Sequence, residues 1–201
     1  MYSLVEEKLL DIREKLGKRS VGIAGIGGLG SNAAIALARM GIGKLVVVDH
    51  DIVEESNLTR QYYFLDQIGK PKVEALRETI RRINPDMEYI GLQEKLVSGG
   101  MHEPFKDVDL VIEALDNAET KTRFIEEILD KLPDKTVIAA TGVTGYGNID
   151  RIKVKHLGNL HICYDPLAKP CEEEVTLASH VALIANWEAE LAIEILLGEK
   201  L

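Results

Sequence analysis

Hydrophobic residues along the chain alternate between short continuous runs and longer stripes with helical spacing. The continuous runs, rich in valine and isoleucine, predict buried strands at about residues 20–25, 44–49, 87–92, 109–114 and 136–140. The stripes predict helices over residues 4–17, 31–40, 70–84, 118–131 and 175–197. Two shorter segments, 149–154 and 161–163, predict late strands that we expect to be antiparallel.

This alternation of strands and helices favours a parallel sheet with helices packed on both faces. We therefore predict an α/β fold: a Rossmann-like, doubly wound, mainly parallel sheet with helices on both faces and a few late antiparallel strands. Neither a repeat nor a linker divides the sequence, so we expect one domain over residues 1–201 that begins with a helix within residues 1–18. The polar stretch 165–174 predicts a mobile loop before the last helix.

The glycine-rich sequence after the first predicted strand indicates a nucleotide site. Gly25, Gly27, Gly28 and Gly30 separate this apolar strand from a predicted helix. Glycine adopts backbone conformations closed to other residues and lets a phosphate approach the main chain closely. The N-terminus of the helix adds unpaired N–H groups and a partial positive charge, which attract an anion. With Asp49 at the end of the next strand, the spacing is typical of a dinucleotide-binding fold.

Polar residues follow several predicted strands at the edge of the sheet where ligands bind in such folds. Asp49 ends one strand, Asp116 and Asn117 follow another, and Thr141 follows a third. Because parallel strands end at the same edge, we expect these residues to lie along one side of the sheet. A carboxylate at the position of Asp49 can accept hydrogen bonds from ribose hydroxyls, and the alternative is a solvated acid in a turn.

The polar loop behind Asp49 favours a triphosphate over a plain dinucleotide. An oxidoreductase has no evident need for Asn57, Arg60 and Lys72 there, whereas negative charge develops on a triphosphate as pyrophosphate leaves. Arg60 would bind phosphate as a fork and Lys72 as a point charge. Asp116 would hold a magnesium ion, which prefers carboxylate and phosphate oxygens. The alternative is that Arg60 and Lys72 are solvated and that Lys72 only flanks a helix.

Together these motifs resemble the ThiF/MoeB/HesA family, which is related to the ubiquitin-activating enzymes, and the short ThiF-type members in particular. The resemblance extends over about residues 18–198, most of the chain. The matching segments are 25–31, 49–51, 56–61, 69–73, 82–85 and Asp116-Asn117 with Arg123.

The resemblance implies ATP-dependent adenylation of the C-terminal Gly-Gly carboxylate of a small ubiquitin-like sulfur carrier protein. It further implies a ThiS-like carrier of thiamine biosynthesis, magnesium held by Asp116 and a homodimer. The residues that it implies as catalytic are Arg60, Lys72, Asp116 and Cys171. The residues that it implies as nucleotide-binding are Gly25, Gly27, Gly28, Gly30, Asp49, Asp51, Asn57, Gln61 and Asn117.

The sequence departs from the family pattern in its cysteines. Many relatives bind structural zinc through two CxxC pairs, which this sequence lacks, so we expect no zinc. Cys163, Cys171, His156 and His161 are the residues from which a zinc site would have to be assembled. In some relatives a cysteine near the position of Cys171 forms a covalent sulfur linkage to the carrier. Three carboxylates follow Cys171 and disfavour its thiolate, so a surface cysteine without function stays open as the alternative.

A second departure lies near the N-terminus. Relatives carry an Arg-Tyr-x-Arg-Gln element there, whose arginine reaches the ATP of the partner subunit, and this sequence lacks the element. Arg13 or Arg19 is the candidate substitute, with a solvated arginine as the alternative.

Net charge and hydrophobicity limit the classes of partner and the location that we expect for this protein. The formal net charge of −9 disfavours nucleic acid, and the sequence shows neither an export signal nor a membrane span, so we expect a cytoplasmic protein. A sibling adenylating enzyme, serving molybdopterin synthesis or tRNA modification, is the nearest alternative function. An NAD-dependent oxidoreductase and a non-catalytic nucleotide-binding protein are the alternatives from other classes.

Overall fold

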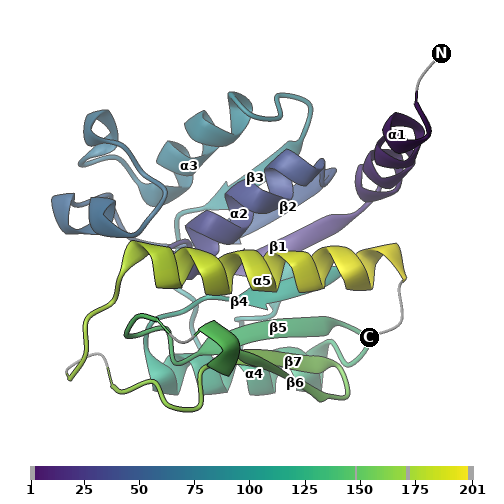
Figure 1. Ribbon diagram of the computed structural model, residues 1–201. Coiled ribbons are helices and arrows are strands. Elements are labelled where there is room, and N and C mark those ends of the chain that lie inside the picture. The colour runs from purple at the N-terminus through teal and green to yellow at the C-terminus, as the bar shows by residue number, and fades with distance from the viewer. Residues whose placement is uncertain (1–2, 148, 171–172, 199–201) are drawn as a thin grey trace.

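A seven-stranded sheet forms the centre of the computed structural model, which describes residues 3–147, 149–170 and 173–198 (Figure 1). The strand order is β3-β2-β1-β4-β5-β7-β6. The strands are β1 (Ser20–Ala24), β2 (Lys44–Val48), β3 (Glu88–Leu92), β4 (Leu110–Glu113), β5 (Thr136–Thr141), β6 (Lys153–Leu157) and β7 (Leu160–Tyr164). All neighbours pair in parallel except β6 and β7. The predicted mainly parallel, Rossmann-like sheet is therefore confirmed.

Helices cover both faces of this sheet, as predicted. They are α1 (Leu4–Leu16), α2 (Gly28–Met40), α3 (Lys72–Arg81), α4 (Ala118–Lys131) and α5 (Ala178–Leu197). Apolar residues of α2, α3 and α5 form one core with one face of the sheet. Phe124 and Ile128 of α4 pack with Phe105 and the opposite face. In Figure 1, α5 crosses in front of the sheet and α4 lies behind β5 and β7.

The strand order reverses between β1 and β4, and this reversal places the site. Strands β2 and β3 lie on one side of β1, and β4, β5 and β7 lie on the other side. In open parallel sheets, ligands bind beyond the carboxyl ends of the strands at such a switch point. A ligand is therefore expected at the carboxyl ends of β1, β2 and β4.

Several predicted boundaries are wrong for identifiable reasons. The helix after the glycine turn begins at Gly28 rather than Ser31, because the N–H of Ser31 already donates to the carbonyl of Gly27 at 3.1 Å and closes the first turn. The last helix begins at Ala178 rather than Val175, because the carbonyl of Val175 accepts a hydrogen bond of 2.7 Å from the N–H of Gly145.

The late strands also differ from the prediction. Residues 149–151 form a 3₁₀ turn, and the antiparallel edge strand is β6, which begins only at Lys153. Its partner β7 is antiparallel to β6 but parallel to β5, so only one late strand runs against the sheet. Within the described residues, the helices lack the combination of length and apolar character needed to cross a membrane.

Candidate nucleotide site

The glycine turn between β1 and α2 is closed by close backbone contacts. Gly25 has φ +82°, and a Cβ atom there would lie 2.8 Å from the carbonyl oxygen of Ala114. A Cβ atom on Gly30 would lie 2.0 Å from the carbonyl oxygen of Gly25. Contacts under about 3 Å with backbone are not tolerated by real side chains. Gly25 and Gly30 are therefore required by the fold of the turn itself.

Gly27 and Gly28 have a different environment, at the open start of α2. The side-chain atom nearest to a Cβ on Gly27 would be Gln61 Nε2 at 3.8 Å, and the nearest to a Cβ on Gly28 would be Val181 Cγ1 at 3.1 Å. Gly27 is the N-cap of α2 and provides no side-chain hydrogen bond to the first turn. The first backbone N–H groups of α2 thus have the arrangement that binds phosphate in other proteins.

Asp49 braces the glycine turn against the end of β2. Its Oδ2 accepts a hydrogen bond of 2.8 Å from the N–H of Ile26, and its Oδ1 accepts one of 2.8 Å from the N–H of Asp51. The residue is only 9% exposed. Each carboxylate oxygen has a second lone pair, so Asp49 can accept the expected bonds from ribose hydroxyls while it keeps its bonds to Ile26 and Asp51.

Lys72 and Asp51 form an ion pair beside this brace. Lys72 Nζ lies 2.7 Å from Asp51 Oδ2, and the side chains are 6% and 48% exposed. Partial burial acts to raise the pKa of Asp51, but the hydrogen bond and charge of Lys72 outweigh it and the pKa is lowered. Lys72 is therefore not solvated, because its side chain is buried at the first position of α3. The alternative of a lysine that only flanks this helix stays open.

Arg60 and Gln61 extend over the start of α2 from the loop that follows β2. A Cβ on Gly28 would lie 3.9 Å from Arg60 Cγ, which places the arginine beside the turn. Arg60 Nη1 donates to the carbonyl of Ser56 and to Thr59 Oγ1, both at 3.3 Å. Among the described residues, no carboxylate forms an ion pair with Arg60. Its charge is therefore not neutralised within the structure.

Asn57 holds the shape of this loop. It is 8% exposed, its Oδ1 accepts from the N–H of Glu54 at 3.1 Å, and its carbonyl accepts from the N–H of Gln61 at 2.8 Å. The loop is also joined to α2, because Asn32 Nδ2 donates to the carbonyl of Arg60 at 3.1 Å. These bonds fix the backbone from which Arg60 and Gln61 project.

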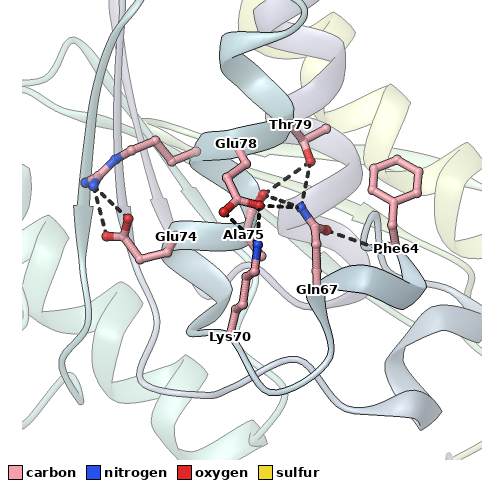
Figure 2. Close-up of polar contacts among 8 residues, drawn as sticks. Phe64, Gln67, Lys70, Glu74, Ala75, Glu78 and Thr79 are labelled. Carbon is pink, nitrogen blue, oxygen red and sulfur yellow. Dashed lines mark hydrogen bonds and ion pairs between the residues drawn. The ribbon is translucent and has the colours of Figure 1, made fainter.

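Gln67 fastens the far end of the same loop to α3, as Figure 2 shows. Its Nε2 donates to the carbonyl of Ala75 at 2.9 Å and approaches Glu78 and Thr79 at 3.4 Å, while its Oε1 accepts from the N–H of Phe64 at 3.1 Å. Gln67 is 4% exposed, so these bonds are shielded from water. The loop with Arg60 and the helix with Lys72 consequently form one connected unit.

Asp116 follows β4 by three residues and is exposed. In the part of the chain that the structure describes, its carboxylate takes no part in an ion pair. A carboxylate in this state fits a magnesium ion that also binds phosphate oxygens. The neighbouring Asn117 caps α4, since its Oδ1 accepts from the N–H of Thr120 at 2.9 Å. Asn117 thus has a structural role besides the predicted nucleotide contact.

Three residues that could bind a metal ion lie together at the end of β2. Ligand atoms of Asp49, His50 and Asp51 lie within 4.8 Å of one another. We assign no metal to them, because backbone N–H groups and Lys72 already compensate the two carboxylates.

The remaining candidate residues are the cysteines and two histidines. Cys171 lies outside the described residues. Cys163 is fully buried in β7, and burial raises the pKa of its thiol to about 12. His156 Nδ1 and His161 Nδ1 lie 2.7 Å apart and bond to each other.

Neither candidate for the missing arginine approaches the glycine turn of its own chain. Arg13 Nη2 donates to the carbonyl of Arg39 at 3.0 Å, at the C-terminal end of α2. With a rise of 1.5 Å per residue, that position is about 16 Å from the start of the helix. Arg19 precedes β1, at the opposite edge of the sheet from the glycine turn.

Two buried acids and a lysine were not among the predicted site residues. Glu113 at the end of β4 is fully buried and forms an ion pair with Lys121 of α4. Glu188 of α5 is fully buried, and neither of its carboxylate oxygens has a hydrogen-bond partner among the described residues. An acid within the apolar run 110–114, and another on the apolar stripe of the last helix, were the available signals. Arg123, by contrast, pairs with Glu119 on the exposed side of α4.

Burial of Glu188 predicts a pH-dependent stability. Burial raises its pKa well above the ordinary value, with Lys121 opposing the shift and Glu113 adding to it. A raised pKa on folding means that stability is fully present below the pKa of the unfolded chain and is lost as pH rises through the folded pKa. We expect Glu188→Gln to remove this loss and, at pH 8, to raise the free energy of unfolding by about 1–3 kcal/mol.

Urea unfolding at pH 5 and pH 8 measures this effect. Glu190→Gln, on the exposed side of the same helix, is the matched control and should leave the pH dependence unchanged. Equal pH dependence in wild type and Glu188→Gln would contradict the expectation.

Comparison with known proteins gives one family. The family model described as "ThiF family" matches residues 3–201. A tRNA threonylcarbamoyladenosine dehydratase of Bacillus subtilis is 35% identical over 159 residues, 78% of this chain and 61% of that protein. The Escherichia coli sulfur carrier protein ThiS adenylyltransferase is 36% identical over 119 residues, 59% of this chain and 47% of that protein. The chain therefore spans about half the length of these curated relatives.

A solved structure gives the same fold. The E. coli tRNA N6-threonylcarbamoyladenosine dehydratase in complex with ATP matches with a TM-score of 0.84, covering 94% of this chain and 89% of that one. At 20% sequence identity, this similarity concerns the fold alone.

Proposed function

Since the chain belongs to the ThiF family, we propose that it uses ATP to adenylate the C-terminal carboxylate of a small ubiquitin-like sulfur carrier protein. The observation that carries the proposal is a pair of cations: Arg60 beside the glycine turn, which no described carboxylate pairs with, and the buried Lys72, which is held by Asp51. A site of this kind stabilises charge that develops on a triphosphate as it is cleaved. A hydride-transfer reaction has no comparable need for it.

In the proposed reaction, a carboxylate oxygen of the carrier attacks the α-phosphorus of ATP. The bond between that phosphorus and the bridging oxygen to the β-phosphate breaks, and pyrophosphate leaves with its electron pair. The N–H groups at the start of α2 orient the phosphates and Asp49 holds the ribose. Arg60 and Lys72 neutralise the leaving pyrophosphate. Asn57, which also fixes the loop, holds phosphate with Gln61 beside it.

Asp116 is the residue that we propose to hold magnesium. Its exposed carboxylate at the end of β4 supplies the hard oxygen ligand that this ion prefers. Bound there, magnesium would offset phosphate charge. The homodimer and the cytoplasmic location remain predictions from the sequence.

We propose a ThiS-like carrier as the substrate, supported by the 36% identity with the E. coli ThiS adenylyltransferase. The 35% identity with the B. subtilis tRNA threonylcarbamoyladenosine dehydratase supports a second candidate, activation of a carboxylate on modified tRNA. The net charge of −9 favours the carrier protein, because an acidic surface repels a long polyanion.

Exchange of labelled pyrophosphate into ATP tests the proposal and separates the two candidates. We expect exchange when wild-type protein is given magnesium, ATP and a carrier ending in Gly-Gly. Carrier lacking its last glycine is the control and should give none. Exchange only with carboxylate-bearing tRNA would favour the second candidate. Absence of exchange with either substrate, together with reduction of NAD, would reject adenylation.

A further inference from the structure

The end of β4 contains a charged pair that the proposed reaction does not use. Glu113 is the last residue of β4, and its side chain is fully buried. Its Oε2 pairs with Lys121 Nζ, whose side chain is 21% exposed, and its Oε1 accepts a hydrogen bond of 2.7 Å from the N–H of Leu115. Both oxygens of this acid are therefore engaged, one by a helix and one by the loop after the strand.

These contacts enclose the short segment that carries Asp116. On the N-terminal side, Leu115 is held by Glu113, and the N–H of Ala114 donates to the carbonyl of Ala24 at 2.8 Å, directly before the glycine turn. On the C-terminal side, Asn117 caps α4, and Lys121 joins the first turn of that helix to Glu113. Asp116 thus projects from a segment fixed at both ends.

Stability alone does not account for this pair. Two charges lose several kcal/mol of hydration on burial, and apolar residues of similar size often serve as well or better. A buried pair does, however, fix a geometry, since each partner has one place that satisfies it. Residues that orient a metal ligand from behind commonly change metal affinity by about 10–100-fold when replaced.

We propose that the Glu113–Lys121 pair is a positioning device that aims the Asp116 carboxylate at the metal bound with the nucleotide. The inference rests on the proposed function, because that function supplies the metal–nucleotide ligand. Glu113 and Lys121 touch neither substrate nor metal in this arrangement. Their effect passes through Leu115 and the first turn of α4.

Binding of Mn²⁺ in the presence of ATP, followed by electron paramagnetic resonance, tests the inference without an activity assay. Glu113→Gln combined with Lys121→Met removes both charges and keeps an oxygen for the N–H of Leu115. We expect this double variant to bind Mn²⁺ about tenfold more weakly and to bind ATP in EDTA as the wild type does. The triple variant that combines these changes with Asp116→Asn should bind Mn²⁺ with the same affinity as the single variant Asp116→Asn, because the pair acts through Asp116.

The matched control is Asp130→Asn with Lys131→Met, which removes an exposed ion pair from the last turn of the same helix. It should bind Mn²⁺ as the wild type does. Lys121→Gln keeps a donor for Glu113 and gives a second test if the double variant does not fold. We expect weaker Mn²⁺ binding with it as well.

Wild-type Mn²⁺ affinity in the folded double variant or in Lys121→Gln would overturn the inference, as would wild-type affinity in Asp116→Asn. These outcomes are distinct from failure of the proposed function. If the wild type shows no pyrophosphate exchange, but the double variant still binds Mn²⁺ more weakly in the presence of ATP, the activity is rejected and the positioning role is supported.

Discussion

Arg60→Ala is expected to lower the rate of pyrophosphate exchange by about 10²–10³-fold, the effect of removing one preorganised charge-stabilising donor from an active site. The reason is that no described carboxylate neutralises Arg60, so its charge is available to the phosphates. The fold should be retained, since among the described residues the guanidinium bonds only to the exposed Ser56 and Thr59 within its own loop. Exchange kinetics and thermal unfolding measure the two effects separately.

The control for this variant is Arg81→Ala, which removes an exposed arginine from α3 and should leave exchange unchanged. Arg60→Lys should recover part of the rate, because lysine restores the charge without the two-pronged geometry. Exchange by Arg60→Ala at the wild-type rate would remove Arg60 from the site.

Gly30→Ala is expected to lower the free energy of unfolding by about 3 kcal/mol or more, at the upper end of overpacking costs. The added methyl group would lie 2.0 Å from the carbonyl oxygen of Gly25, and both positions belong to backbone that other contacts hold in place. The turn must open to admit it, so ATP binding should be lost as well. Denaturant unfolding and nucleotide titration give the two measurements.

Two other glycines make this prediction specific. A methyl group on Gly28 meets Val181 Cγ1 at 3.1 Å, a side-chain atom that can shift, and we expect a smaller loss of stability. Gly100→Ala meets its nearest atom only at 3.8 Å and should be close to neutral. Equal stability of the Gly30 and Gly100 variants would show that the turn is less tightly closed than described.

The fold was largely predictable because its signals are local. Strands buried on both faces are continuous apolar runs, as at 110–112, and the helices between them show a clear stripe. The errors lie where distant backbone decides the outcome. Val175 pairs with Gly145, and residues 149–151 turn before the edge strand begins, neither of which local propensity encodes.

The candidate site was predictable where a motif carries the chemistry. Asp49 contacts the glycine turn at the strand ends and Arg60 lies beside it, while their roles in binding a nucleotide stay predictions. What the sequence left open is the state of each group: Lys72 is buried and paired, whereas no carboxylate in the described part of the chain pairs with Arg60. Glu113, Lys121 and Glu188 were not predicted, because the sequence does not show whether a charged side chain is buried or solvated.

The contact between Val181 and Gly28 brings the first turns of α5 and α2 together at one edge of the sheet. Each helix has a partial positive charge at its N-terminus, so we expect the two to attract an anion at this edge of a protein whose net charge is −9. A compact anion such as a nucleotide phosphate can approach these charges within a few ångströms. An extended anionic polymer would gain the same attraction at one spot and meet repulsion along the rest of its length. We therefore expect this arrangement of two helices to select anions by size.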